Sequence, residues 1–161
     1  MTSTHPTPQH NPQAAQQYLR TKVLTATPEQ LQLMLYDGAL RFGEQARVAL
    51  LARRFEDSYQ NISQVQKILT ELTCSLKPDV FPELCEKLGA LYSYAYRQLV
   101  EANLNHNVQS LDEAMSVLRY QRETWALMME QLGKQKAAAA AKRIDMPAPD
   151  GGMEASISMR G

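Results

Sequence analysis

Few side chains in this chain of 161 residues could do acid–base, metal or nucleophilic chemistry. The histidines are His5, His10 and His106, and the cysteines are Cys74 and Cys85. The Glu-x-x-His pairs of di-iron bundles are absent, as are the phosphate-binding P-loop and the glycine-rich dinucleotide fingerprint. The cysteine spacing fits neither a disulfide framework nor a zinc knuckle, so both thiols are expected to be free. We expect no cofactor, no metal and no enzyme activity.

His106 is the one histidine for which a phosphotransfer role can be considered. That role needs an exposed histidine in the middle of a helix, whereas His106 lies in "NLNHN", between two asparagines in an expected turn. A solvated loop histidine is the simpler interpretation. An enzyme or phosphorelay module is therefore the weakest of three hypotheses, and the other two are binding proteins.

Charge and composition exclude several classes of partner. Lys plus Arg and Asp plus Glu number 17 each, so the chain lacks the positive charge that nucleic-acid binding requires. No cationic start is followed by an apolar run, and no stretch of ~18 apolar residues exists. We expect a cytoplasmic protein with no nucleic-acid partner and no membrane insertion.

The ends of the chain differ in composition from its middle. Residues 1–17 are rich in Pro, Gln, Thr and Asn, and residues 134–161 carry Pro and Gly with little periodicity. Such segments bury too little apolar area to offset their ordering entropy, so both are expected to be disordered tails. The stretch "KAAAAAK" could instead extend the preceding helix. Residues 18–133 are expected to form one helical domain.

Apolar residues in the middle recur at helical spacing in four segments. The first has Thr27 as N-cap, Pro28 at its first position and Gln30 to complete a capping box, and it should end near Leu51. The others should begin near residues 55 and 82 and after Asn107. Because the connections are short, consecutive helices must turn back on one another. The fold class is all-α, an antiparallel up-down-up-down four-helix bundle with an N-terminal covering segment or short helix.

The first of these helices has more apolar surface than one buried side needs. One stripe is assigned to the core: Leu31, Met34, Leu35, Gly38, Phe42, Ala46 and Ala49. Leu33, Leu40 and Leu51 fall nearly opposite, with Tyr36 on their flank. This back stripe would be an exposed apolar patch, of the kind that marks a binding surface, unless something covers it.

The segment just upstream, "YLRTKVLTA", can supply that cover. In one interpretation its apolar residues, which include Tyr18 and Leu24, fold permanently over the back stripe. In the other, the segment exchanges with a partner peptide, because a short segment before a helix cap detaches at little cost. Both alternatives remain open at this point.

Four successive motifs resemble those of the FliS family of bacterial flagellar export chaperones. They are "VLTATPEQLQLMLYDGALRF", "NISQVQKILTEL", "LYSYAYRQLVEAN" and "LDEAMSVLRYQRETW". The resemblance implies a cytoplasmic chaperone without ATPase activity that binds the disordered C-terminal segment of flagellin. Such a chaperone prevents premature polymerisation and brings flagellin to the type III export gate. An anti-sigma factor is a further possible partner.

With the back stripe and the upstream segment, the resemblance gives a set of expected client-binding residues. They are Tyr18, Leu24, Leu33, Tyr36, Asp37, Leu40, Tyr92, Tyr96, Arg97 and Asn103. Leucines and tyrosines in a groove do not name a ligand, however. The alternative function is a helical-bundle regulatory adaptor that binds another amphipathic client.

Overall fold

The structure is a computed structural model, and it describes residues 11–146. Within that range every regular element is a helix, so the all-α class is confirmed. The helices are α1 (Pro12–Thr25), α2 (Pro28–Leu51), α3 (Phe55–Cys74), α4 (Pro82–Asn105) and α5 (Val108–Ile144). The chain divides into two units, Met1–Ala126 and Leu127–Gly161, and α5 contributes to both.

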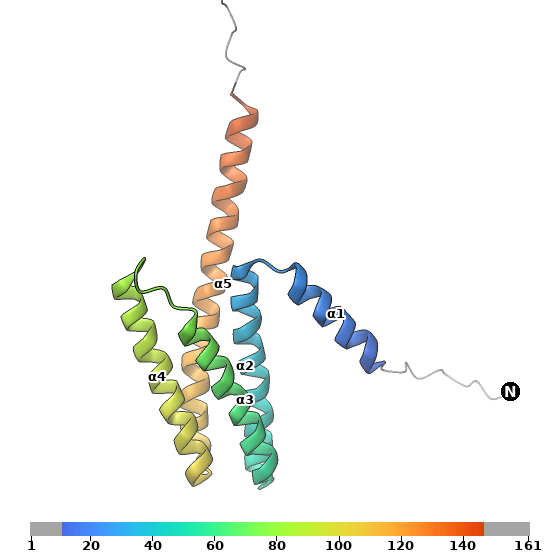
Figure 1. The fold of residues 1–161 in the computed structure, drawn as a ribbon, viewed down its shortest axis with the longest axis vertical. Helices are drawn as coiled ribbons and strands as arrows, with labels where there is room; N and C mark the ends of the chain where they lie inside the picture. The colour runs from blue at the N-terminus through green and yellow to red at the C-terminus, as the bar shows by residue number, and fades with distance from the viewer. Residues whose placement is uncertain (1–10, 147–161) are drawn as a thin grey trace, which may run out of the picture. The chain divides into compact units, whose positions relative to one another are not determined.

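Helices α2, α3, α4 and the first part of α5 lie side by side, and each runs opposite to the one before it (Figure 1). Two ion pairs join α2 to α5: Arg47 Nε lies 2.8 Å from Asp112 Oδ1, and Arg122 Nε lies 2.9 Å from Asp37 Oδ1. Residue numbers rise along α2 as they fall along α5, so these two helices are antiparallel. All four side chains are more than a third exposed, and such pairs contribute little stability.

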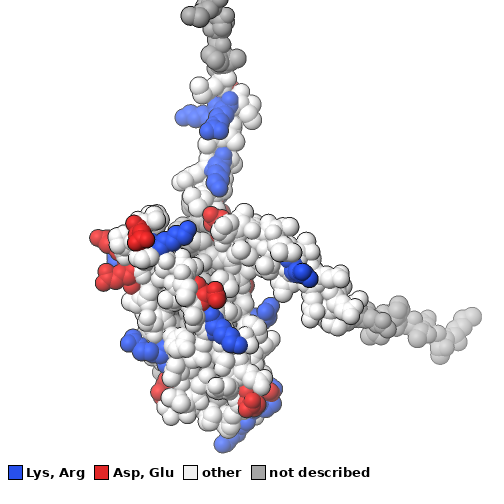
Figure 2. All heavy atoms as spheres, in the orientation of Figure 1, with Lys and Arg blue, Asp and Glu red and all other residues white. Residues whose placement is uncertain are grey.

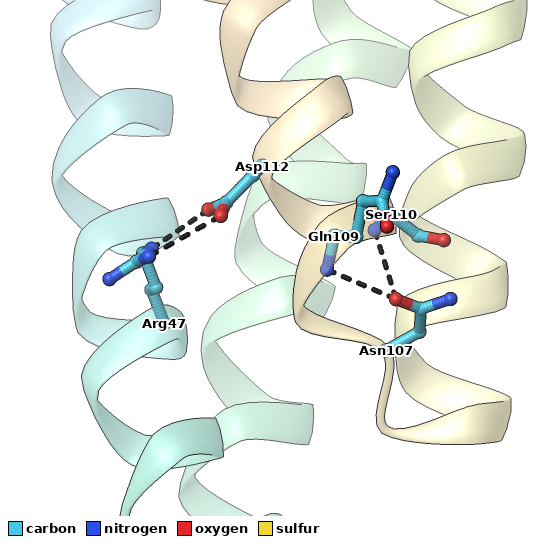
Figure 3. Close-up of polar contacts among 5 residues, drawn as sticks. All are labelled: Arg47, Asn107, Gln109, Ser110 and Asp112. Carbon is cyan, nitrogen blue, oxygen red and sulfur yellow. Dashed lines mark hydrogen bonds and ion pairs between the residues drawn. The ribbon is translucent and has the colours of Figure 1, made fainter.

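Side-chain caps begin two of the helices at the predicted residues. Thr27 Oγ1 accepts a hydrogen bond from the backbone N–H of Gln30 at 3.2 Å, and Gln30 Oε1 accepts one from the Thr27 N–H at 2.9 Å. Asn107 Oδ1 accepts from the N–H groups of Gln109 and Ser110, which begins α5 (Figure 3). Each cap satisfies backbone donors that the first helical turn leaves unpaired.

Two turns each place one residue in the left-handed backbone region. Arg53, after α2, has a φ of 59°, and His106, after α4, has a φ of 52°. The His106 ring stacks on Phe55, the first residue of α3, with 3.9 Å between ring centroids. His106 is therefore held in a turn rather than in mid-helix. His5 and His10 lie outside the described residues.

The core face of α2 was predicted only in part. Its buried residues are Tyr36, Ala39, Gly43, Ala46, Ala49 and Leu50. Of the predicted core stripe, Ala46 and Ala49 are buried, Leu35 and Phe42 are half-buried and pack against the core, and Leu31, Met34 and Gly38 are half-buried. The core face was predicted from the positions of large apolar side chains, whereas helices approach one another closely where side chains are small.

The other helices bury regular stripes against this face. The buried residues of α3 are Ser58, Ile62, Val65, Leu69 and Leu72, and those of α4 are Tyr92, Ala95, Leu99 and Ala102. On α5 they are Ser110, Leu111, Ala114, Met115, Leu118 and Gln121. All of the buried residues of α5 thus lie in the first of the two units.

Helices α1 and α5 extend into segments that were expected to be disordered. Helix α1 begins at Pro12, and α5 continues to Ile144. The alanine-rich stretch therefore extends the preceding helix, which the sequence had left as an alternative. Residues 1–10 and 147–161 of the predicted tails lie outside the described residues.

Helix α1 buries none of its residues. Tyr18 and Leu24 are 71% and 74% exposed, and Leu19 and Val23 are also exposed. In this structure the upstream segment is thus the predicted short helix, and it does not close over the bundle. Its backbone joins α2 through Ala26 and Thr27 alone.

We expect alanine substitutions at two glycines of α2 to have opposite effects on stability. A Cβ added at Gly43 would lie 2.2 Å from Met115 Cε, so Gly43→Ala should lower the free energy of unfolding by about 1–3 kcal/mol. A Cβ at Gly38 would lie 3.6 Å from Ile68 Cδ1, which is ordinary contact. Gly38→Ala should therefore raise the free energy of unfolding by roughly 0.5–1 kcal/mol. Urea unfolding of both variants measures the direction of each change in unfolding free energy. A stabilised Gly43→Ala would contradict the close approach of Met115 to Gly43.

Candidate functional site

An open apolar cleft separates α1 from the outer face of α2. Its volume is about 510 Å³, and Leu19, Lys22 and Val23 form the wall that α1 contributes. The wall from α2 consists of Leu31, Met34, Leu35, Asp37, Gly38 and Arg41. The leucines and the methionine give the cleft an apolar interior, while Lys22, Asp37 and Arg41 add charges. This arrangement suits an amphipathic peptide better than a small polar ligand.

A second groove runs between α3 and α4 and has a volume of about 330 Å³. Its lining residues are Leu69, Thr70, Thr73, Cys74, Tyr92, Ser93, Tyr96 and Arg97. Leu69 and Tyr92 are buried, and Tyr96 is 40% exposed. The groove therefore has an apolar floor, an aromatic residue that a ligand could contact, and the cation of Arg97.

A buried tyrosine pair lies beneath this groove. The hydroxyl oxygens of Tyr36 on α2 and Tyr92 on α4 are 2.5 Å apart, and the two residues are 2% and 1% exposed. Each hydroxyl thereby satisfies the other within the core, where an unpaired one would cost free energy. Burial, reinforced by the hydrogen bond to Tyr36, raises the pKa of Tyr92 far above its ordinary value of about 10.

The structure divides the predicted site residues of α2 between core and surface. Tyr36 is in the core and presents no surface to a client. Leu40 packs against the core and, with Met115 and residues of α2 and α5, lines a small polar pocket. Leu33 is half-buried. Asp37 is exposed, lines the α1–α2 cleft and pairs with Arg122. Leu33 and Leu40 therefore do not form an exposed back stripe, which corrects the sequence assignment.

The predicted residues on α1 and α4 lie in several places. Tyr96 and Arg97 border the α3–α4 groove, with Tyr92 at its floor. Asn103 is half-buried near the end of α4 and lines neither the groove nor the cleft. Tyr18 and Leu24 are exposed on α1 but are not among the residues that line the cleft. The expected set is thus spread over two surfaces.

Sequence reasoning missed most of the cleft. Leu31 and Met34 were assigned to the core, and Leu19 and Val23 were noted only as part of a possible cover. Leu35, also assigned to the core, packs against it and lines the cleft as well. A signal for the correct face was present. The small residues Ala39, Gly43 and Ala46 follow one another in steps of four and three, the spacing of a closely packed helix seam.

The described residues offer little for metal or membrane chemistry. Between residues 11 and 146, no group of three or more His, Cys, Asp or Glu side chains is placed to hold a metal ion. Over the same range, no helix combines the length and apolarity needed to cross a bilayer. Cys74 and Cys85 are free thiols, as predicted.

A protein-family model described as "Flagellar protein FliS" matches residues 11–132. This chain belongs to the FliS family. Its similarity to the flagellar secretion chaperone FliS of Bacillus subtilis is 36% identity over 115 residues, which covers 71% of this chain and 84% of that protein. The protein of the same name from Escherichia coli is 30% identical over 112 residues, 69% of this chain and 82% of the relative.

A solved structure supports the fold independently. The crystal structure of a bacterial flagellar chaperone superimposes with a TM-score of 0.61 and covers 74% of this chain and 97% of that one. The two chains are 21% identical, so this likeness speaks for the fold alone. The family match begins at the N-cap of α1 and therefore includes both walls of the cleft.

We expect the effects of mutating the two tyrosines on stability to be non-additive. Tyr92→Phe leaves the buried Tyr36 hydroxyl without its partner and should cost about 1–3 kcal/mol of stability. Removing both hydroxyls, in Tyr36→Phe/Tyr92→Phe, should cost less than either single change. Chemical denaturation of the three variants at neutral pH checks this, and additive losses would contradict it.

The same pair predicts loss of stability in alkali. The pKa of Tyr92 is raised in the folded state, so its contribution is complete below the unfolded pKa of about 10 and declines as the pH rises above that value. The melting temperature of the native protein should therefore fall more steeply above pH ~10 than that of the double phenylalanine variant.

Proposed function

We propose that this protein is a cytoplasmic flagellar secretion chaperone that binds the disordered C-terminal segment of flagellin. By holding that segment it prevents premature polymerisation and helps deliver flagellin to the type III export apparatus. Membership of the FliS family supports the chaperone role. The observation that carries the binding mode is the open apolar cleft between α1 and α2. We propose binding without catalysis.

The client is an amphipathic segment that becomes helical as it binds. Its apolar face would meet Leu31, Met34 and Leu35 on one side and Leu19 and Val23 on the other. Burial of apolar area contributes about 25 cal/mol per Å², and the cost of ordering the client opposes it. Affinity therefore depends on a large contact area, which one short helix in one cleft does not provide.

The α3–α4 groove supplies a second contact for the same client. Tyr96 offers an amphipathic ring and Arg97 a cation, both at the surface. A flexible client that occupies both surfaces gains from effective concentration, because binding at one site brings the next segment close to the other. Holding flagellin by this extended contact also keeps the segment from pairing with other flagellin subunits.

We expect two charge substitutions on α2 to separate binding from folding. Met34 lines the cleft and lies outside the buried core, so Met34→Glu should leave the melting temperature nearly unchanged. It should weaken binding of a flagellin C-terminal peptide on the order of a hundredfold, because a carboxylate would be buried against an apolar client. Leu40→Glu is the matched variant, and it should lower the melting temperature by several degrees because Leu40 packs against the core.

Titration calorimetry and thermal unfolding of both variants measure these effects. If Met34→Glu binds the peptide normally while the native protein binds it tightly, the cleft is not the client site. If the native protein does not bind the peptide at all, the proposed function itself is wrong. An unfolded Met34→Glu would place this residue in the core and contradict the assignment of the outer face.

Deleting residues 1–25 tests the role of α1. The bundle should melt at nearly the same temperature, because α1 buries no residue. Peptide affinity should fall, since the cleft loses its Leu19 and Val23 wall while no covering contact has to be displaced. Higher affinity would show instead that α1 competes with the client, and unchanged affinity would show that α1 neither covers nor contacts the site.

A further inference from the structure

The last turns of α5 lie mostly beyond the family match, which ends at residue 132. We call residues 131–144 the C-terminal arm. Every residue of the arm is exposed. Its alanine run, residues 137–141, has the highest intrinsic helix propensity, so the arm can be helical without packing against anything. Packing therefore does not account for the charged residues of the arm, and these need a separate explanation.

The arm is strongly basic. It contains Lys134, Lys136, Lys142 and Arg143 and no carboxylate. Lys134 Nζ pairs with Glu130 Oε1, one turn earlier, at 3.0 Å. Within the described part of the chain, the other three cations have no ion-pair partner. Figure 2 shows blue side chains gathered along this part of α5, while the bundle carries both signs. The whole protein has no net charge, so the arm is a local concentration of positive charge.

Helix stability explains only part of this charge. Lys142 and Arg143 lie in the last turn of α5, where cations interact favourably with the helix dipole. That effect is confined to the last turn, so it does not explain Lys136 or the absence of carboxylates over fourteen residues. An anionic partner surface along the whole length of the arm would explain both Lys136 and the absence of carboxylates.

The arrangement of the arm matches a lipid surface. Lys136, Ala139, Ala140, Arg143 and Ile144 border one shallow hollow, so two cations share a side of the helix with small apolar residues. Long Lys and Arg stems can lie along an apolar layer while their charges reach anionic headgroups. A tight protein interface needs a central cluster of large anchoring residues, whereas the arm's large apolar side chains, Leu132 and Ile144, lie at its two ends. The apolar Leu132 and Ile144 have no role on a nucleic-acid backbone.

We propose that the C-terminal arm binds anionic phospholipid at a membrane surface. The arm would lie in the headgroup layer without crossing the bilayer. Each cation near an anionic surface strengthens binding by roughly fivefold, and the four together by on the order of a hundredfold or more. The proposal goes beyond client binding: it gives the protein a reversible position at the membrane that secreted cargo must cross.

The test is flotation of the full-length protein with vesicles. Vesicles of equal parts phosphatidylglycerol and phosphatidylcholine should bind it at low salt, and pure phosphatidylcholine vesicles should not. Binding should weaken as salt rises, because the interaction is between exposed charges. In the arm variant, Lys134→Gln/Lys136→Gln/Lys142→Gln/Arg143→Gln, binding to the mixed vesicles should fall on the order of a hundredfold.

A matched control removes the same number of charges elsewhere on the surface. Its changes are Arg20→Gln, Lys67→Gln, Lys77→Gln and Lys87→Gln, all at exposed residues. This control should keep its vesicle binding. An equal loss in both variants would overturn the proposal, because net charge rather than the arm would then control binding. Absence of binding by the native protein at low salt would also overturn it.

Two further probes distinguish other polyanions and the proposed function. If the arm binds poly-L-glutamate or duplex DNA more tightly than the mixed vesicles, its partner is an acidic protein or a nucleic acid, and the lipid proposal is wrong. Titration with the flagellin C-terminal peptide should give the same affinity for the native protein and the arm variant. A failure of peptide binding would thus count against the chaperone function. A failure of flotation would count against lipid binding by the arm.

Discussion

The buried contact between Tyr36 and Tyr92 is the constraint on which the orientation of α2 depends. It joins α2 to α4 in the interior, where water cannot replace either partner. A small rotation of α2 would carry Tyr36 out of the core together with the small residues Ala39, Gly43 and Ala46, so this face as a whole sets the orientation of α2. Once Tyr36 points inward, Leu31 and Met34 are carried to the outer side, while Leu35 packs against the edge of the core. The apolar outer surface of α2 thus follows from which of its residues are buried.

Sequence reasoning recovered the helices more fully than their orientation. Thr27 and Asn107 act through short-range hydrogen bonds that depend on neighbouring residues, so their caps could be read directly. Gly43 lies against Met115, which is distant in the chain, so the contact itself cannot be inferred from neighbouring residues. The spacing of small residues on α2 indicated a closely packed face, but the periodicity of large apolar residues was followed instead.

The candidate site shows the same limit. Tyr96 and Arg97 were predicted from a motif, and the structure places both beside one groove. Tyr36 was expected at the surface because it lies on the flank of the predicted back stripe, but its hydroxyl has a buried partner on another helix. The cleft could not be predicted because two helices form it, and only the structure shows how α1 leaves the outer face of α2 open.

The capping box at Thr27 also has an evolutionary consequence. Thr27 and Gln30 each pair the other's backbone N–H with a side-chain oxygen, so this cap does not use the residues before it. Substitutions in α1 therefore escape selection for folding and are exposed only to selection for what α1 contacts. The N-terminal segment can diverge along with a changing partner while the bundle remains constant. Lineages with different partners should differ in sequence first in the residues that precede Thr27.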